Sequence, residues 1–268
     1  MARVVAVIPC RYGSTRFPGK PLAELAGMPL MWHVHQQCLK AGHVDEAVIA
    51  TDDERIADAC ARLGIPHQMT GEHSTGTDRV AECAESLDAD IIVNVQGDEP
   101  FISPAAIDAV IAVFLKPVVP RQAVANAYTE LACPAAVIDH NVVKVVLRGD
   151  GTALTFSRHP VPYPKGVRTA YLRQLGLYAF TPEALRTFAS LRPGPVEKAE
   201  GIEMLRFLEH SHSVAMVRVQ DEGIAVDTPA DLERAASLTA ASTATAGPPA
   251  VIRLSNSATG RPKQGSGS

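Results

Sequence analysis

The chain has 268 residues, 46% of them apolar and 20% charged, which is enough apolar material for one large or two small globular domains. The 29 acidic and 25 basic residues are interspersed and give a net charge of −4, so the sequence offers no basic stripe for a nucleic-acid partner. No apolar run reaches the roughly 20 residues that cross a bilayer, and the first residues show no signal-peptide cleavage pattern. We therefore expect a cytoplasmic protein without a membrane partner.

In the first hundred residues, short apolar runs alternate with helical patterns. The predicted strands are 4–9, 47–51 and 91–96, and the predicted helices are 30–41, 54–63 and 78–87. In the last of these helices, apolar residues recur at the spacing i, i+3, i+4 and i+7, which gives it one buried face. Strands that alternate with helices are typical of an α/β fold with a parallel sheet.

Between residues 120 and 225 the pattern changes to a series of strands. The expected strands are 123–131, 142–147, 153–158, 174–180 and 213–220, and the expected helices are 196–209 and, farther on, 229–238. A proline-rich turn from His159 to Pro164 interrupts the strands. This pattern predicts a smaller mixed-sheet region, at about 120–225, inserted into or appended to the parallel core.

The domain boundary is expected near residue 238. We predict one domain over residues 1–238. Residues 239–268 are rich in small polar residues, glycine and proline, and have too little apolar surface to offset the entropy of ordering. They are expected to form a disordered tail.

The segment that follows the first strand, from Arg11 to Leu22, has a composition suited to binding phosphate. It contains two glycines, two hydroxyl residues and the cations of Arg11, Arg16 and Lys20. Ligands of open parallel sheets bind at the carboxyl ends of strands, and cationic side chains there make charge-assisted hydrogen bonds to phosphate oxygens. The spacing is not that of a Walker A loop, and no GxGxxG motif is present. An exposed basic turn is the other interpretation.

Two aspartates are candidates for a magnesium site. Asp98 follows the predicted strand 91–96, and Asp227 follows a short apolar run near residue 225. Mg²⁺ takes carboxylate oxygens and keeps waters and substrate phosphates as its other ligands. Turn geometry alone would also explain Asp98, whereas helix capping explains Thr228 to Asp231 without requiring Asp227.

A fourth polar segment runs from His73 to Arg79 and opens the predicted helix 78–87. A helix N-terminus with an arginine in its first turn favours anions or nucleotide acceptor groups. The alternative is that Thr77 and Asp78 cap the helix, while His73 and Arg79 are ordinary solvated side chains.

Six motifs in one chain order resemble the 3-deoxy-manno-octulosonate (Kdo) cytidylyltransferases, also called CMP-Kdo synthetases. The motifs are Arg11-x-x-Ser-Thr-Arg-x-Pro-Gly-Lys-Pro-Leu22, His73-x-x-Gly-Thr-Asp-Arg79, Asn94-Val-Gln-Gly-Asp-Glu-Pro100, Phe156-Ser-Arg158, Leu175-Gly-Leu-Tyr178 and Val226-Asp-Thr-Pro-x-Asp-Leu232. The resemblance extends from about residue 3 to residue 236. It implies a Rossmann-like nucleotidyltransferase fold with a parallel core sheet and a smaller mixed-sheet region that forms a homodimer interface.

The resemblance also implies a reaction and a role for each site residue. A family member transfers CMP from CTP to an acceptor, releases pyrophosphate and uses Mg²⁺. The nucleotide-binding residues would be Arg11, Ser14, Arg16, Lys20, Arg79 and Gln96, with Arg11, Lys20 and Asp98 catalytic and with Asp98 and Asp227 as metal ligands. The acceptor-binding residues would be Arg158, Gln174, Tyr178, Glu203 and Met204.

Two departures from the family pattern fall among the acceptor residues. Gln174 stands where the family has histidine, and Met204 stands where it has glutamine. Fewer polar partners for a polyhydroxylated sugar favour a smaller, highly charged acid. The hypothesis is therefore a phosphonate acceptor such as phosphonoformate, and the alternative is Kdo bound by a substituted pocket.

Two other function classes fit the sequence less well. A nucleotide-sugar glycosyltransferase would also place an aspartate and a metal at a strand end, but the three cations between Arg11 and Lys20 suit a leaving pyrophosphate better. A non-enzymatic nucleotide sensor would have little reason to keep Asp98, Asp227 and Arg158 together.

Overall fold

The computed structural model describes residues 2–14, 16–115, 124–167, 169–220 and 225–245. Four parallel strands form one half of its main sheet, in the order β6-β1-β4-β5. They are β1 (Val4–Cys10), β4 (Glu46–Thr51), β5 (His67–Met69) and β6 (Ile91–Val95). Ala6 and Ile8 of β1 pack into one apolar cluster, whereas Val7 packs into the cluster on the opposite face. Because β1 is covered on both faces, its sequence is a continuous apolar run.

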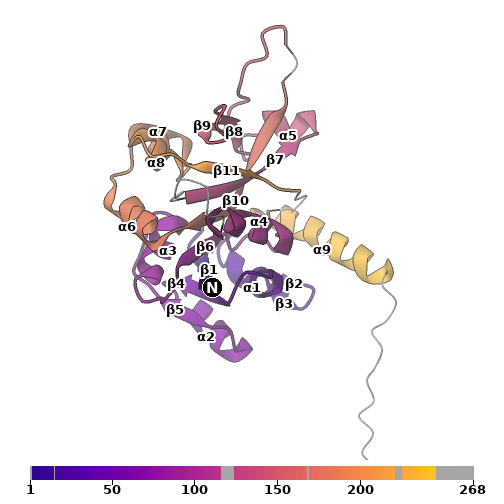
Figure 1. The fold of residues 1–268 in the computed structure, drawn as a ribbon. Coiled ribbons are helices and arrows are strands. Elements are labelled where there is room, and N and C mark those ends of the chain that lie inside the picture. Colours follow the sequence, from indigo (N-terminus) through magenta and orange to yellow (C-terminus); the bar gives the residue numbers. More distant parts are fainter. Residues whose placement is uncertain (1, 15, 116–123, 168, 221–224, 246–268) are drawn as a thin grey trace, which may run out of the picture.

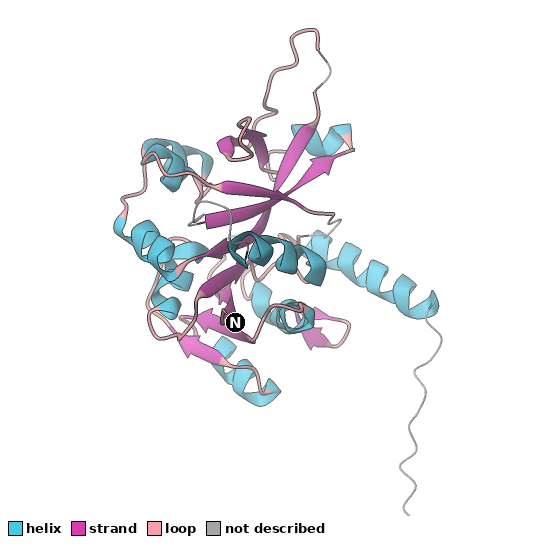
Figure 2. Cartoon of the chain, in the orientation of Figure 1, coloured by secondary structure: helices cyan, strands magenta, loops and turns pink. Residues whose placement is uncertain are grey.

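Strand β10 (Tyr171–Phe180) joins the parallel half to the mixed half by pairing antiparallel with β6. On its other edge lies β7 (Val124–Leu131), which is antiparallel to β10, and β11 (Ala215–Arg218) runs parallel to β7. The hairpin of β8 (Lys144–Leu147) and β9 (Ala153–Ser157) pairs with one end of β10. In the described ranges, nine strands thus form one continuous sheet, and the mixed region extends the parallel core (Figure 2).

Helices cover both faces of this sheet (Figure 1). The cluster on one face includes side chains of α1 (Leu30–Lys40), α2 (Glu54–Leu63) and α4 (Pro104–Leu115). The cluster on the other face includes side chains of α3 (Gly76–Ala84), α6 (Pro182–Ser190) and α8 (Leu205–Glu209). The short elements are η1 (Lys20–Leu22), β2 (Glu24–Leu25), β3 (Met28–Pro29), α5 (Pro134–Ile138) and α7 (Pro195–Glu200). None of the described helices combines the length and apolar character needed to cross a membrane.

The α/β class, the parallel core and the mixed sheet are confirmed, but two predicted elements are wrong in extent. The segment 196–209 is two helices, because Gly201 adopts a left-handed conformation (φ 61°) that ends α7 before α8 begins. Helix α9 (Pro229–Thr245) continues past residue 238, so the first seven residues of the expected tail at 239–268 are helical. Alanine favours helix strongly and recurs in that stretch. The rest of the tail, 246–268, lies outside the described residues.

A buried arginine ties together the helices on the face of α3. The Arg206 side chain is 2% exposed and pairs with Asp78 of α3 at 2.7 Å and with Glu197 of α7 at 2.8 Å. Its guanidinium lies 3.9 Å from the centre of the Phe188 ring on α6. A buried charge is tolerated when its hydrogen bonds are satisfied, so this group requires the helices to stay in register with one another.

Replacing Arg206 with alanine should lower the free energy of unfolding by about 3–5 kcal/mol, because it leaves the Asp78 and Glu197 carboxylates without their buried cation. Urea unfolding followed by circular dichroism measures the change. Arg218→Ala is the matched control, since Arg218 and Glu130 are paired at the surface with 66% and 51% of their side chains exposed; its cost should be below about 1 kcal/mol. Equal losses in the two variants would show that burial of the Arg206 group is not what stabilises this face.

Candidate active site

One cleft lies at the carboxyl ends of β1 and β6, where ligands of open parallel sheets bind. Nine of the predicted site residues line it, and they come from segments far apart in the chain. They are Arg11, Ser14, Arg16, Lys20, Arg79, Gln96, Asp98, Glu203 and Asp227. The four other predicted residues, Arg158, Gln174, Tyr178 and Met204, are not among the lining residues of the described chain.

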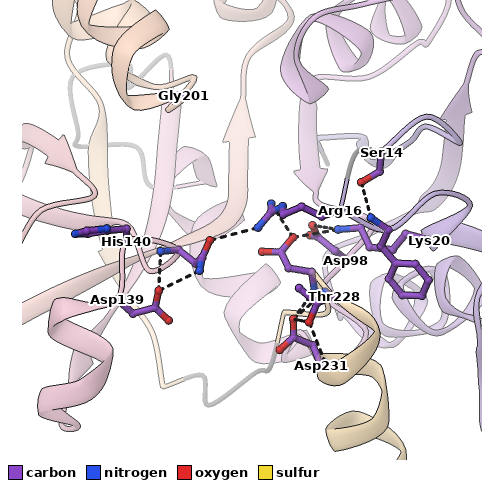
Figure 3. Close-up of polar contacts among 12 residues, drawn as sticks. Ser14, Arg16, Lys20, Asp98, Asp139, His140, Gly201, Thr228 and Asp231 are labelled. Atoms are coloured by element: carbon purple, nitrogen blue, oxygen red, sulfur yellow. Dashed lines mark hydrogen bonds and ion pairs between the residues drawn. The ribbon is translucent and has the colours of Figure 1, made fainter.

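The two predicted metal ligands converge on a single cation (Figure 3). The ammonium of Lys20 donates to Asp98 Oδ2 at 2.7 Å and to Asp227 Oδ1 at 3.2 Å. A backbone hydrogen bond of 2.8 Å from Val226 N to Asp98 O holds the two carboxylate-bearing segments side by side. The backbone itself therefore places the two carboxylates close together.

The start of α9 frees the Asp227 carboxylate for this role. Thr228 caps the helix, and the Asp231 carboxylate accepts from Thr228 N at 2.8 Å and from Asp227 N at 3.1 Å. Capping thus occupies Asp231 and Thr228, as the sequence indicated, and leaves the Asp227 side chain to bind Lys20 and Arg16.

The charge of Lys20 is stabilised by its two acidic neighbours. Burial of the side chain works to lower the pKa of Lys20, but the charges of Asp98 and Asp227 and their hydrogen bonds outweigh it and raise the pKa above 10.5. Lys20 is therefore a permanent cation at neutral pH and can serve phosphate oxygens as well as carboxylates.

The remaining cations of the first loop have different partners. Arg16 donates to Asp227 Oδ1 at 3.3 Å and to Asn141 Oδ1 at 3.3 Å, and so reaches across to the mixed-sheet region (Figure 3). Arg11 lines the cleft and has no hydrogen-bond partner within the described part of the chain. Ser14 accepts from Phe17 N at 3.3 Å, which shapes the loop. The segment thus forms a wall of the cleft, in which Arg11 and Arg16 are exposed and Lys20 is partly buried.

Arg79 and His73 hold another wall in place. Arg79 is 3% exposed, pairs with Asp52 at 2.6 Å and donates to Gly71 O at 3.2 Å. His73, which precedes α3, pairs with Glu82 of that helix. Both side chains are therefore bonded in the structure, and the interpretation that they are ordinary solvated residues is wrong.

Glu203 faces the cleft from the turn between α7 and α8. Its carboxylate accepts from Gly76 N at 2.9 Å and from Thr77 N at 3.1 Å, at the N-terminus of α3. Burial raises the pKa of Glu203, and the hydrogen bonds from Thr77 and Gly76 oppose that shift without cancelling it. The adjacent Met204 points the other way: it is fully buried in the apolar cluster beneath α3 and α6, so the structure does not bring it to the acceptor side as predicted.

Three further acceptor candidates are not among the residues that line the cleft. The guanidinium of Arg158 donates to Glu200 O at 2.6 Å and to His140 O at 2.9 Å, and therefore fastens the end of α7 to the turn after α5. Gln174 and Tyr178 are buried on β10, where Gln174 Nε2 donates to the tyrosine hydroxyl at 3.2 Å. Burial, with nearby carboxylates including Glu203, raises the pKa of Tyr178, which keeps its hydroxyl protonated.

Sequence reasoning missed Asp52 and Asn141, which position Arg79 and Arg16. Asp52 carried a usable signal, because it directly follows β4 and the carboxyl ends of parallel strands share one edge of the sheet. Asn141 carried none, since its contact with Arg16 joins residues 125 positions apart in the chain.

The shared ammonium predicts how stability depends on pH. The folded pKa of Lys20 is raised, so its contribution is fully present below the unfolded value of 10.5 and is lost as the pH rises through the folded value. The difference in free energy of unfolding between the wild type and Lys20→Met should thus be constant near pH 8 and shrink above about pH 10.5. Urea unfolding at both pH values tests this, with the exposed Lys198→Met as control. A difference that does not change with pH would contradict the assignment.

Comparisons with known proteins agree with this geometry. The family described as cytidylyltransferase matches residues 5–215 of the chain. The 3-deoxy-manno-octulosonate cytidylyltransferase of Anaeromyxobacter dehalogenans is 46% identical over 248 residues, covering 90% of this chain and 99% of that protein. The corresponding enzyme of Geobacter metallireducens is 43% identical over 246 residues, covering 87% and 96%.

A solved structure is similar over the same length. It is a CMP:2-keto-3-deoxy-manno-octonic acid synthetase complexed with CTP, which is 36% identical, has a TM-score of 0.84 and covers 90% of this chain and all of the other chain. The family match, the relatives and this structure all extend over both the parallel core and the mixed region. The chain belongs to the cytidylyltransferase family and is a CTP-dependent nucleotidyltransferase.

Proposed function

We propose that this enzyme transfers CMP from CTP to Kdo. The observation that carries the proposal is the cleft in which four cationic side chains, of Arg11, Arg16, Lys20 and Arg79, meet three carboxylates, of Asp98, Asp227 and Glu203. A hydroxyl oxygen of the acceptor forms a bond to the α-phosphorus and releases its proton to water, and the bond from that phosphorus to the oxygen that bridges it to the β-phosphorus breaks. Pyrophosphate leaves with the electron pair, and CMP stays on the acceptor.

The cations of the first loop bind and orient the triphosphate. Arg11, Arg16 and Lys20 line the same wall, and their charges offset the negative charge that builds up on the leaving pyrophosphate. Arg16 and Lys20 hold carboxylate oxygens in the structure, and phosphate oxygens are acceptors of the same kind. These side chains therefore position the triphosphate and stabilise the negative charge of the leaving pyrophosphate.

The carboxylates of Asp98 and Asp227 suit Mg²⁺. Both already contact one cation, the Lys20 ammonium, so their oxygens converge on one point. The described residues contain no group of three acidic, histidine or cysteine side chains arranged for a metal, so waters and phosphate oxygens would complete the coordination. When bound, Mg²⁺ would polarise phosphate oxygens and stabilise the charge of the transferred group.

The acceptor is better assigned to Kdo than to a phosphonate. The relatives, 41–46% identical over most of the chain, are Kdo cytidylyltransferases, which favours the alternative over the phosphonoformate hypothesis. That hypothesis used Met204, whose side chain lies in the core, and Gln174, which is buried on β10. Neither substitution lines the cleft, so neither supports a change of acceptor.

Homodimerisation through the mixed-sheet region stays a prediction. It is supported by large apolar side chains that lie exposed there: Leu154 is 50%, Val167 73% and Tyr163 85% exposed. Exposed apolar groups gathered in one region are typical of protein interfaces.

Pyrophosphate release from CTP and Mg²⁺, with Kdo or phosphonoformate as acceptor, tests the function. Release should be much faster with Kdo, and Asp98→Asn should lower the rate by about 100-fold or more, because it removes one carboxylate charge from the converging pair. Asp88→Asn is the control, since its side chain is 98% exposed. Preference for phosphonoformate, or a fully active Asp98→Asn enzyme with intact circular dichroism, would refute the proposal.

A further inference from the structure

A chain of hydrogen bonds runs inside the protein from Glu203 to Gln96. It begins where the Glu203 carboxylate accepts from Gly76 N at 2.9 Å and from Thr77 N at 3.1 Å. A backbone N–H can only donate, so each carboxylate oxygen is an acceptor. Because an ionised Glu203 carboxylate can only accept, the Thr77 hydroxyl must donate to it, and this determines the direction of every bond that follows.

The direction is transmitted through two fully buried side chains. The Thr77 hydroxyl donates to Glu203, and its oxygen then accepts from Asn94 Nδ2 at 3.1 Å. Asn94 Oδ1 in turn accepts from Gln96 Nε2 at 3.2 Å. Thr77 and Asn94 are both 0% exposed, so water does not replace any of these partners. If the Asn94 amide were flipped, its carbonyl oxygen would face the Thr77 hydroxyl oxygen, whose proton is already donated to Glu203. Two buried acceptors would then face each other without a donor.

The chain fixes which end of the Gln96 amide faces the cleft. Its NH₂ group is bonded inward to Asn94, and its carbonyl oxygen has no hydrogen-bond partner among the residues that the structure describes. Two glycines enclose the side chain. A Cβ on Gly76 would lie 3.1 Å from the Gln96 amide atoms, and a Cβ on Gly176 would lie 2.9 Å from Gln96 Cγ. The amide is thus held in a narrow slot with one orientation.

We propose that Thr77 and Asn94 are positioning residues, which hold the Gln96 carbonyl oxygen toward the cleft to accept a hydrogen bond from a substrate hydroxyl. The inference rests on the proposed function, in which the hydroxyl belongs either to the ribose of CTP or to the sugar acid. Ionised phosphate and carboxylate oxygens cannot donate, so this wall reads a neutral, donor-bearing part of a substrate and not its anionic part. Gln96 touches the substrate, whereas Thr77 and Asn94 act through it.

Thr77→Val and Thr77→Ser form the matched pair that tests this role. Valine has nearly the same shape but no hydroxyl, and serine keeps the hydroxyl. Thr77→Val should raise one KM by about tenfold, as expected for the loss of one hydrogen bond, and Thr77→Ser should stay within about twofold of the wild type. A rise in the KM for Kdo alone identifies the sugar acid as the donor of this hydrogen bond, and a rise in the KM for CTP alone identifies the nucleoside part of CTP. No change in either KM, or an equal rise in both, would overturn the proposal.

A second variant tests whether the chain acts as a unit. Asn94→Ala and the double variant Asn94→Ala/Thr77→Val should raise the same KM by the same factor as Thr77→Val, because one break already releases the Gln96 amide. Independent effects that multiply in the double variant would contradict a single chain.

A third measurement does not depend on the acceptor. The side-chain NH₂ protons of Gln96 can be followed by NMR and assigned by the loss of their signals in Gln96→Leu. They should exchange slowly with water in the wild type and in Thr77→Ser, and fast in Thr77→Val. Equal exchange rates in all three proteins would show that this chain of hydrogen bonds does not hold the Gln96 amide, even if catalysis is normal. Slow exchange in a wild type that releases no pyrophosphate with Kdo would instead refute the proposed function and leave the chain standing.

Discussion

The binding of one ammonium group by two carboxylates is the contact on which the cleft depends. Lys20 belongs to the first loop, Asp98 to the end of β6 and Asp227 to the segment before α9, and the bond between Lys20 and Asp227 joins residues 207 positions apart. Two carboxylates so close together repel each other unless a cation lies between them. The contact between Lys20 and Asp227 therefore holds the start of the last helix near the end of the first strand, on one side of the cleft.

The two sides of the cleft are built in different ways. On the side of the first loop, cationic and acidic side chains project into the cleft and bind one another. On the side of α3, α7 and α8, the polar groups are held by buried networks: Arg206 fixes the helices, and the break at Gly201 lets Glu203 face the cleft while Met204 enters the core. Substitutions on this second side therefore act through the position of a wall as well as through direct contact.

The sequence predicted three of the four parallel strands and the cleft residues that follow them, because buried strands leave continuous apolar runs and ligands bind where such strands end. It missed β5, a strand of three residues without a buried apolar run. It did not predict the direction of side chains beyond a helix break. Met204 and Glu203 are neighbours in the chain, and only the turn after Gly201 sends one inward and the other to the cleft.

The partners of Arg158 are backbone carbonyls of Glu200 and His140, and backbone groups leave no signature in a sequence. Helix α4 was missed since it is apolar nearly all round and shows no helical period.

Anomalous diffraction can show whether Asp98 and Asp227 bind one metal ion together. Crystals of the protein grown with CTP and Mn²⁺, measured near the manganese edge, should show a peak bonded to a carboxylate oxygen of each aspartate, with the Lys20 ammonium moved from between them toward the phosphates. A manganese peak on the triphosphate that neither aspartate contacts, with Lys20 still bridging the pair, would contradict the account.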